Sequence, residues 1–282
     1  MFYLIFSILC SVLVAALFKV ARQKNKEVFV MVNVNYIIAI LFSFFLFDAN
    51  YYKPRVYGES LYLFSFLGIL LPTLFIILSK SITETGIIKT DIAQRFSLII
   101  PILVSVIIWN QPLAFNKIFG LIIGFIALGF LLFKKETAVN KSYLYPLLVL
   151  LGYGIVDVLF KKVALINQIL YTDSLLLIFT FAFLTSSLIG VYLFFKKKIK
   201  YSLSSVYWGI GLGVLNFVNI FCYIKAHKIL KDNPAVVFST MNFGVILVST
   251  LLGYFYFKEN INKYNTIGIL LSLIAIALIT IF

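Results

Sequence analysis

The sequence predicts an all-α polytopic membrane protein with ten transmembrane helices, arranged as two inverted five-helix repeats. Three observations support this prediction: the apolar composition, the length of the apolar runs and the recurrence of polar positions along the chain. Of the 282 residues, 62% are hydrophobic and 12% are charged, and the mean hydropathy is +1.07. A soluble domain averages about 45–50% apolar and about 25% charged residues. The composition therefore excludes a soluble globular protein, and it is too apolar for a disordered one.

Ten apolar runs follow one another along the chain, each of 19 to 25 residues. A helix of about 20 residues crosses the hydrocarbon core of a bilayer. Helices are required because backbone polar groups in lipid must be satisfied within their own segment, and the alternating ten-residue pattern of barrel strands is absent from the sequence. The runs are 2–20, 28–47, 60–79, 86–109, 115–133, 143–163, 172–195, 203–227, 234–257 and 264–282.

Polar segments separate these runs and give the helices their ends. Pro234 falls in the first turn of the ninth helix, where a missing N–H costs little. Pro72 and Pro101 lie inside the third and fourth helices, where proline removes a hydrogen bond, so we expect kinks there. The clearest polar segments are 22–27, 50–59, 134–136, 196–200 and 231–234.

Polar and glycine positions recur along the chain at a nearly constant spacing. With a shift of 148 positions, residues 75–133 align with 223–281 without a gap. With a shift of 142, the opening run 2–20 aligns with the run 143–163. The matches include Lys80 with Lys228, Gln94 with Asn242, Gly120 with Gly268, Tyr3 with Tyr145 and Lys19 with Lys161.

These matches predict two five-helix halves, 1–133 and 143–282, joined by a basic loop at 134–142. Because each half has an odd number of helices, the halves cross the membrane in opposite senses, which is the inverted repeat of secondary transporters. Small residues at 120, 124, 268 and 272 predict close packing of the fifth helix against the tenth, since small side chains let helix backbones approach. A dimer interface is the alternative for these faces.

The net charge is +14, from 24 Lys and Arg against 10 Asp and Glu. The basic residues lie mostly between the apolar runs, which indicates a topology signal and contact with lipid headgroups rather than nucleic-acid binding. The loops after the odd-numbered helices carry 15 of the 24, which predicts cytoplasmic placement for them and external termini. We expect a multi-pass protein of a bacterial inner membrane, as a monomer or homodimer.

The segments that join the last helices of each half resemble the EamA-type members of the drug/metabolite transporter superfamily. In that family the fourth helix of each half runs into a short loop with an acidic residue, and the next helix opens near a glycine. The first copy here has Pro101, Gln111, Gly120 and Ala127, and the second has Glu259, Gly268, Ser272 and Ala275. The first copy departs from the pattern, because Gln111 stands where the family usually has Glu. The resemblance implies a ten-helix transporter of small metabolites and leaves the substrate open.

Arg95 lies near the middle of the fourth helix, where a charge costs roughly 2.5–3.5 kcal/mol on insertion scales. Asp91 precedes it by four residues, so both lie on one helical face. One interpretation is a self-neutralised ion pair that holds the helix in the bundle. The other is an anchor for a carboxylate or phosphate, because the guanidinium binds either by two parallel hydrogen bonds. Gln94 and its repeat mate Asn242 fall near the membrane midplane, where inverted-repeat carriers bind substrate.

A second group of polar residues lies in the other helices. Asp157 and Lys161 are four residues apart in the sixth helix, and Asp91 and Asp157 are the candidate carboxylates for coupling to a proton. Asparagines in lipid seek partners on other helices, so interhelical hydrogen bonds and substrate contact are both open for this group. The further candidate substrate residues are Asn35, Tyr36, Asn216 and Asn219.

The sequence gives no pattern for catalysis, a metal or a cofactor. His227 is the one histidine, and Cys10 and Cys222 lie inside apolar runs, which indicates neither a disulfide framework nor a metal site. A membrane enzyme acting on a lipid-linked substrate and a non-transporting scaffold are the alternatives. We predict a secondary transporter of a small polar metabolite that works by alternating access, with a pocket lined by helices 1–4 and 6–9 and a seam formed by helices 5 and 10.

Overall fold

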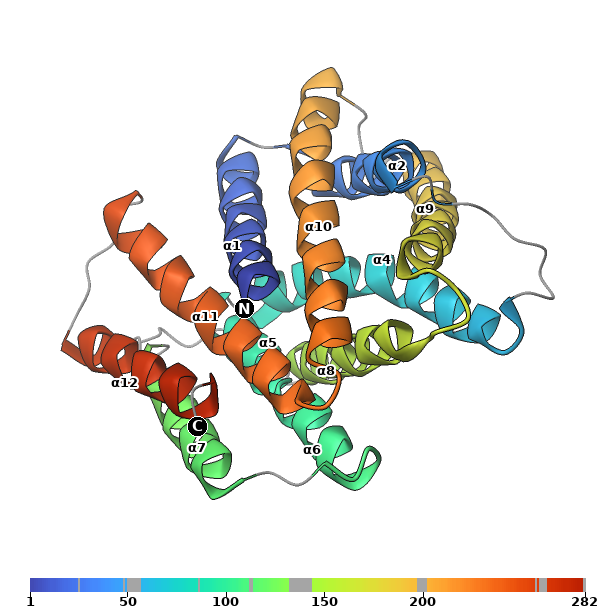
Figure 1. The fold of residues 1–282 in the computed structure, drawn as a ribbon. Helices are drawn as coiled ribbons and strands as arrows, with labels where there is room; N and C mark the ends of the chain where they lie inside the picture. Colours follow the sequence, from blue (N-terminus) through green and yellow to red (C-terminus); the bar gives the residue numbers. More distant parts are fainter. Residues whose placement is uncertain are drawn as a thin grey trace. The chain divides into compact units, whose positions relative to one another are not determined.

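The structure is a computed structural model, and its helices account for all ten predicted segments. It describes residues 1–24, 26–47, 49, 57–85, 87–111, 114–131, 144–196, 202–256, 258 and 263–280. Within this part of the chain the regular secondary structure is helical, which confirms the all-α prediction. The predicted linker 134–142 and Glu259 lie outside the described residues. The helices, labelled in Figure 1, are α1 (Phe2–Gln23), α2 (Val28–Phe47), α4 (Ser60–Thr85), α5 (Ile87–Phe96), α6 (Ile99–Ile107), α7 (Phe115–Leu131), α8 (Leu144–Leu165), α9 (Tyr171–Phe195), α10 (Leu203–Ile229), α11 (Pro234–Phe255) and α12 (Lys263–Thr280).

Seven of the described helices are long and apolar enough to cross a membrane. Two shorter apolar helices lie at Ala93–Ile107 and Phe115–Phe130. Large apolar side chains stand exposed along the helices, with Phe115 of α7 at 84% exposure. Such side chains are a liability in water and are the expected surface of a protein in lipid. The seven long helices are α1, α2, α4, α9, α10, α11 and α12.

The fourth predicted helix, for which a kink at Pro101 is expected, is divided into the two helices α5 and α6. Pro101 has no N–H, so the carbonyl of Ser97 lacks its donor four residues later. That carbonyl instead accepts from the N–H of Ile100 at 3.0 Å, and Leu98 donates to the carbonyl of Arg95 at 3.3 Å. These short-range bonds form a turn that ends α5 and starts α6. Pro72, by contrast, lies within α4, which continues on both sides of it.

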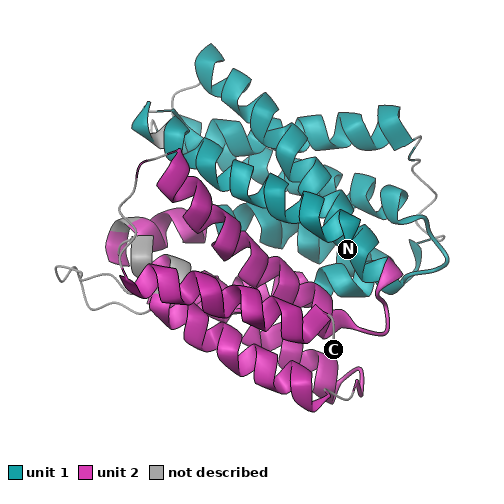
Figure 2. Ribbon diagram, turned by 60° about the vertical axis from the view of Figure 1, so that its left-hand side comes forward, with its two compact units in different colours: residues 1–75, 159–228 teal, residues 76–158, 229–282 magenta. Residues whose placement is uncertain are grey.

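The chain forms two compact units, coloured separately in Figure 2. Unit 1 comprises residues 1–75 and 159–228, and unit 2 comprises residues 76–158 and 229–282. Each unit combines segments from both predicted halves, so the division by contact differs from the predicted division of the sequence. The two inverted repeats themselves stay a prediction.

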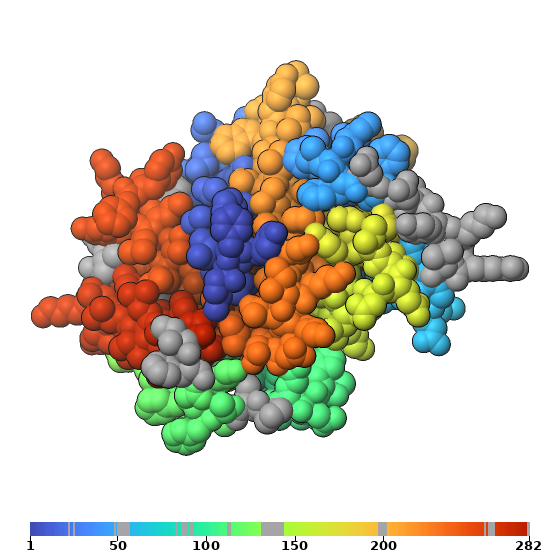
Figure 3. All heavy atoms as spheres, viewed as in Figure 1, coloured from blue at the N-terminus to red at the C-terminus, as the bar shows by residue number. Residues whose placement is uncertain are grey.

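Unit 1 is held by close helix pairs. α2 lies along α9, and α10 packs on α2 through two glycines (Figure 1). A Cβ atom on Gly209 would lie 2.7 Å from Cβ of Val34, and one on Gly213 would lie 2.6 Å from Cβ of Ile38. Only glycine allows the two helices to approach this closely. On the face seen in Figure 3, side chains of α1 (blue) lie against those of α10 (orange).

Unit 2 has its most extensive contact between α7 and α12, as the small residues of both helices predict. Ala127 and Ala275 are fully buried, and a Cβ atom on Gly120 would lie 2.7 Å from Cγ1 of Ile279. Gly124 faces the ring of Phe243 on α11. The predicted packing of the fifth helix against the tenth is therefore confirmed.

Candidate functional site

Three polar side chains of unit 2 gather beside the break between α5 and α6. Arg95 is the penultimate residue of α5, and its Nε atom is buried. Tyr153 on α8 lies within electrostatic range of both Arg95 and Asp157. Asp157 follows Tyr153 by one turn of the same helix, so the two side chains lie on one face. Tyr153 and Asp157 therefore share one face of α8, and Arg95 lies within electrostatic range of Tyr153.

Gly154, which lies between Tyr153 and Asp157 on α8, allows α6 to pack closely against α8. A Cβ atom on Gly154 would lie 2.7 Å from Cβ of Ile100, which belongs to the first turn of α6. Any larger side chain at 154 would push this turn away. Gly154 therefore allows α8 to lie close to the first turn of α6, which follows the break after α5.

The end of α5 at the helix break is also a favourable place for the positive charge of Arg95. Arg95 lies in the last turn of α5, where the carbonyl end of the helix dipole favours a positive charge. Broken helices at membrane depth are tolerated where other groups satisfy the backbone, and carriers use such breaks at their substrate and ion sites. The hydroxyl of Ser97 donates to the carbonyl of Gln94 at 2.6 Å, which satisfies one backbone oxygen at the break.

The predicted pair Gln94 and Asn242 belongs to the same unit. Asn242 on α11 donates from its side-chain amide to the carbonyl of Phe238 at 3.0 Å. Ser239 bonds the carbonyl of Ala235 in its own helix at 2.5 Å, whereas the hydroxyl of Thr240 is buried without a hydrogen-bond partner among the described residues. Asp91 belongs to α5, but its side chain lies outside what the structure describes, so its pairing with Arg95 stays a prediction.

The predicted asparagines of unit 1 join helices to one another. Asn216 on α10 donates to the side-chain carbonyl of Asn35 on α2 at 3.0 Å, and Asn35 is fully buried. The side-chain carbonyl of Asn219 accepts from the hydroxyl of Ser7 on α1 at 2.7 Å. These bonds are the interhelical contacts that the sequence left open. Tyr36 is also buried, at 1% exposure.

Lys161 lies in a second polar cluster, which the sequence did not reveal. Its side chain is 1% exposed and its charge acts on His227, which is completely buried. The imidazole packs edge-on against Tyr223, with ring centroids 4.7 Å apart. Asp173, in the first turn of α9, is also buried in unit 1. The one available signal in the sequence is the four-residue spacing of Tyr223 and His227, which places both on one face of α10.

Groups that bind metals are not assembled in the described part of the chain. No cluster of three or more His, Cys, Asp or Glu is found there. Cys10 and Cys222 are free thiols, both buried.

Comparisons with known proteins show which family the chain belongs to. A profile of the EamA-like transporter family matches residues 140–281. A Haemophilus influenzae relative described as an uncharacterized protein is 43% identical, over 97% of this chain and 95% of its own. A solved crystal structure with 12% identity covers 99% of this chain and 98% of its own at a TM-score of 0.73, which shows a shared fold. The helical, apolar structure and the match over half of its length establish that the chain belongs to the EamA-like transporter family.

Proposed function

We propose that the protein is a secondary transporter that moves a small polar metabolite bearing an anionic group, such as an amino acid, by alternating access. The observation that supports this proposal is the cluster of Arg95, Tyr153 and Asp157 beside a broken helix. A buried cation in a membrane protein is costly and is retained where it has a use. Membership in the EamA-like transporter family supports transport as the general activity.

Arg95 binds the anionic group of the substrate. Its planar guanidinium presents parallel N–H donors that match a carboxylate or phosphate, and bonds between charged groups are stronger than neutral ones. Tyr153 adds an O–H donor on the same side. Gln94 and Asn242 supply further polar contacts to the rest of the solute, and Asn35, Tyr36, Asn216 and Asn219 are candidates for the same role.

Asp157 is the coupling group. Its carboxylate lies near the same phenol as Arg95, so its charge balances that of Arg95 when substrate is absent. A proton on Asp157 removes this competing negative charge and so strengthens the hold of Arg95 on an anion. Proton and substrate thus bind together, which is the requirement for coupled transport. Asp91 is the second candidate for this role, and Lys161 is a candidate ion-pair partner.

The test is uptake into liposomes containing the purified protein, with solutes chosen from a metabolite profile of cells that have or lack it. We expect Arg95→Ala to reduce uptake about 30-fold or more, because it leaves the substrate anion without its partner. Arg95→Lys should recover part of the loss, since it keeps the charge without the planar fork. Lys162→Gln, which removes an exposed cation on α8, is the matched control and should transport normally.

The coupling arm uses Asp157→Asn in the same liposomes. This variant should exchange substrate across the membrane but fail to accumulate it in response to a pH gradient. Full activity of Arg95→Ala would remove Arg95 from the substrate site. Unchanged accumulation by Asp157→Asn under a pH gradient would exclude Asp157 as the coupling group.

A further inference from the structure

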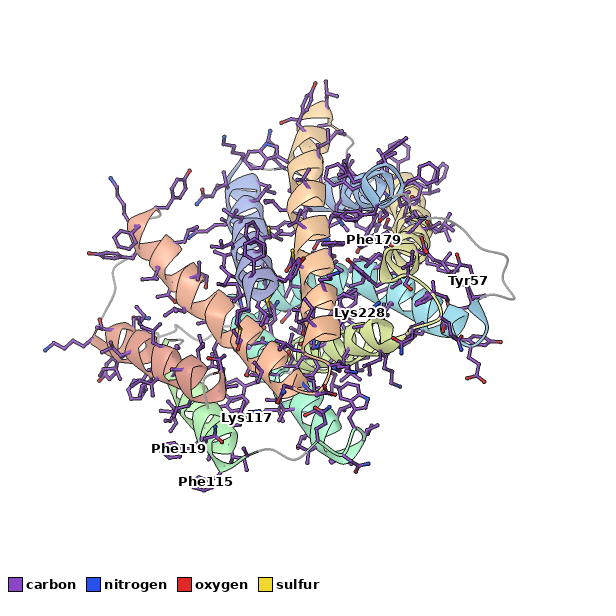
Figure 4. All side chains as sticks on the ribbon, viewed as in Figure 1. Tyr57, Phe115, Lys117, Phe119, Phe179 and Lys228 are labelled. Atoms are coloured by element: carbon purple, nitrogen blue, oxygen red, sulfur yellow. The ribbon has the colours of Figure 1, made fainter. Side chains whose placement is uncertain are left out.

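Two lysine ammonium groups of unit 1 converge on one tyrosine ring. Lys225 and Lys228 lie one turn apart near the end of α10, and Tyr171 is the first residue of α9. The Nζ atoms of Lys225 and Lys228 lie 5.3 Å and 5.5 Å from the centroid of the Tyr171 ring. Figure 4 labels Lys228 at this end of α10. These contacts are cation–π interactions, which hold an ammonium group against the face of a ring.

The ring is fixed by neighbouring aromatic residues. Tyr171 packs on Phe221 with centroids 5.4 Å apart, and Phe221 packs on Phe47 of α2 at 4.4 Å. Tyr3 of α1 lies within electrostatic range of Tyr171. The two ammonium groups of α10 therefore meet at a ring of α9 that is held in place by Phe221.

A tyrosine ring attracts cations but carries no net charge, so Tyr171 itself does not neutralise the two positive charges. Among the described residues, neither Lys225 nor Lys228 forms an ion pair with a carboxylate. Both side chains are partly buried, whereas Lys231, just beyond the helix, is exposed. Snorkelling and the helix dipole explain a single lysine at a helix end. They do not explain two ammonium groups drawn together over a ring from another helix.

We propose that Lys225, Lys228 and Tyr171 form a binding site for a phosphate group. A phosphate supplies the missing negative charge and accepts hydrogen bonds from both ammonium groups. The site lies at the ends of two membrane-spanning helices, α9 and α10, which is the depth of lipid phosphates. The phosphate comes from an anionic phospholipid headgroup or from a soluble phosphate ester, two sources with the same chemistry.

The test is a titration of the purified full-length protein, followed by native mass spectrometry, with phosphatidylglycerol as the lipid probe and glycerol 3-phosphate as the soluble probe. Each lysine near an anionic group contributes about fivefold in affinity. The double variant Lys225→Gln/Lys228→Gln should therefore bind its probe about 30-fold more weakly. Tyr171→Phe keeps the ring and should bind nearly as well as wild type, while Tyr171→Leu should lose affinity.

The matched control is Lys24→Gln, which removes a single lysine that lies over Trp208 at 5.3 Å and should leave binding unchanged. The thermal midpoint of each variant in detergent reports folding. Lysine-dependent binding of phosphatidylglycerol alone identifies a lipid site, and lysine-dependent binding of glycerol 3-phosphate identifies a site for soluble esters. Equal binding by wild type and the double variant, or no binding of either probe by wild type, would overturn the proposal. Because Arg95 and Asp157 belong to unit 2, the result is independent of the transport test.

Discussion

At the scale of single residues, the packing beside the candidate site depends on Gly154, whose lack of a side chain leaves room for α6. Gly154 lies one residue from Tyr153 and three from Asp157, and it faces Ile100 on α6. Arg95 and Asp157 are visible in the sequence as costly charges in apolar runs, whereas Tyr153 is uncharged and the sequence analysis did not single it out. The close approach of α8 to α6 beside them depends instead on the small size of Gly154.

We expect Gly154→Val to push the first turn of α6 away from α8 and to separate Arg95 from Tyr153 and Asp157. Overpacking of this kind typically costs about 1–3 kcal/mol, so the thermal midpoint should fall and transport should decline with it. Gly129→Val is the matched control, because a Cβ atom at Gly129 would meet nothing within 4 Å. Thermal unfolding in detergent and liposome uptake check both variants. Equal effects of the two substitutions would contradict this account of Gly154.

At the scale of secondary-structure elements, the break between α5 and α6 is the feature that distinguishes the fourth membrane segment. Proline at 101 removes one N–H, and the resulting turn falls directly after Arg95. Proline at 72 occurs in a helix that stays continuous. The same residue type thus has different consequences in two apolar runs of similar length.

Pro101→Ala restores an N–H that reaches the carbonyl of Ser97 in a regular helix, so we expect α5 and α6 to merge. Interior proline costs a helix about 3 kcal/mol relative to alanine, so the variant should be at least as stable as wild type. Transport should nevertheless fall, because the ends of the broken helix at the site are lost. Pro72→Ala is the control and should transport normally. Thermal midpoints in detergent and uptake rates in liposomes are measured for both variants. Full transport activity of Pro101→Ala would refute a role for the α5–α6 break in transport.

At the scale of the whole molecule, the predicted inverted repeat is open to a direct test of topology. The loops after the second and seventh helices, 50–59 and 196–202, follow helices at corresponding positions of the two halves. In opposite orientations these loops lie on opposite sides of the membrane.

We expect Glu59→Cys and Ser202→Cys to be labelled from opposite faces of sealed vesicles by a membrane-impermeant maleimide. Both positions are exposed, and the native Cys10 and Cys222 are buried, so a background without these two thiols gives a clean measurement. Labelling of both introduced cysteines from the same face would rule out the inverted arrangement.

The sequence alone predicted the membrane class and the ten helical segments, and it singled out Arg95 as a candidate site residue. Partition between water and lipid is nearly additive over residues, so a run of apolar residues and a charge within it are readable one position at a time. The α7–α12 contact was also predictable, because small residues recur on one face of each helix.

Only the tertiary structure showed that Asn216 donates to Asn35, that His227 is buried within electrostatic range of Lys161 and that two lysines contact Tyr171. These helices are apolar around most of their circumference, so hydropathy does not mark which face meets which neighbour. That choice follows from the fit of side chains on segments far apart in the chain, such as Gly213 against Ile38. Packing of this kind depends on the shapes of two helix surfaces together, so it cannot be predicted from the sequence of one helix alone.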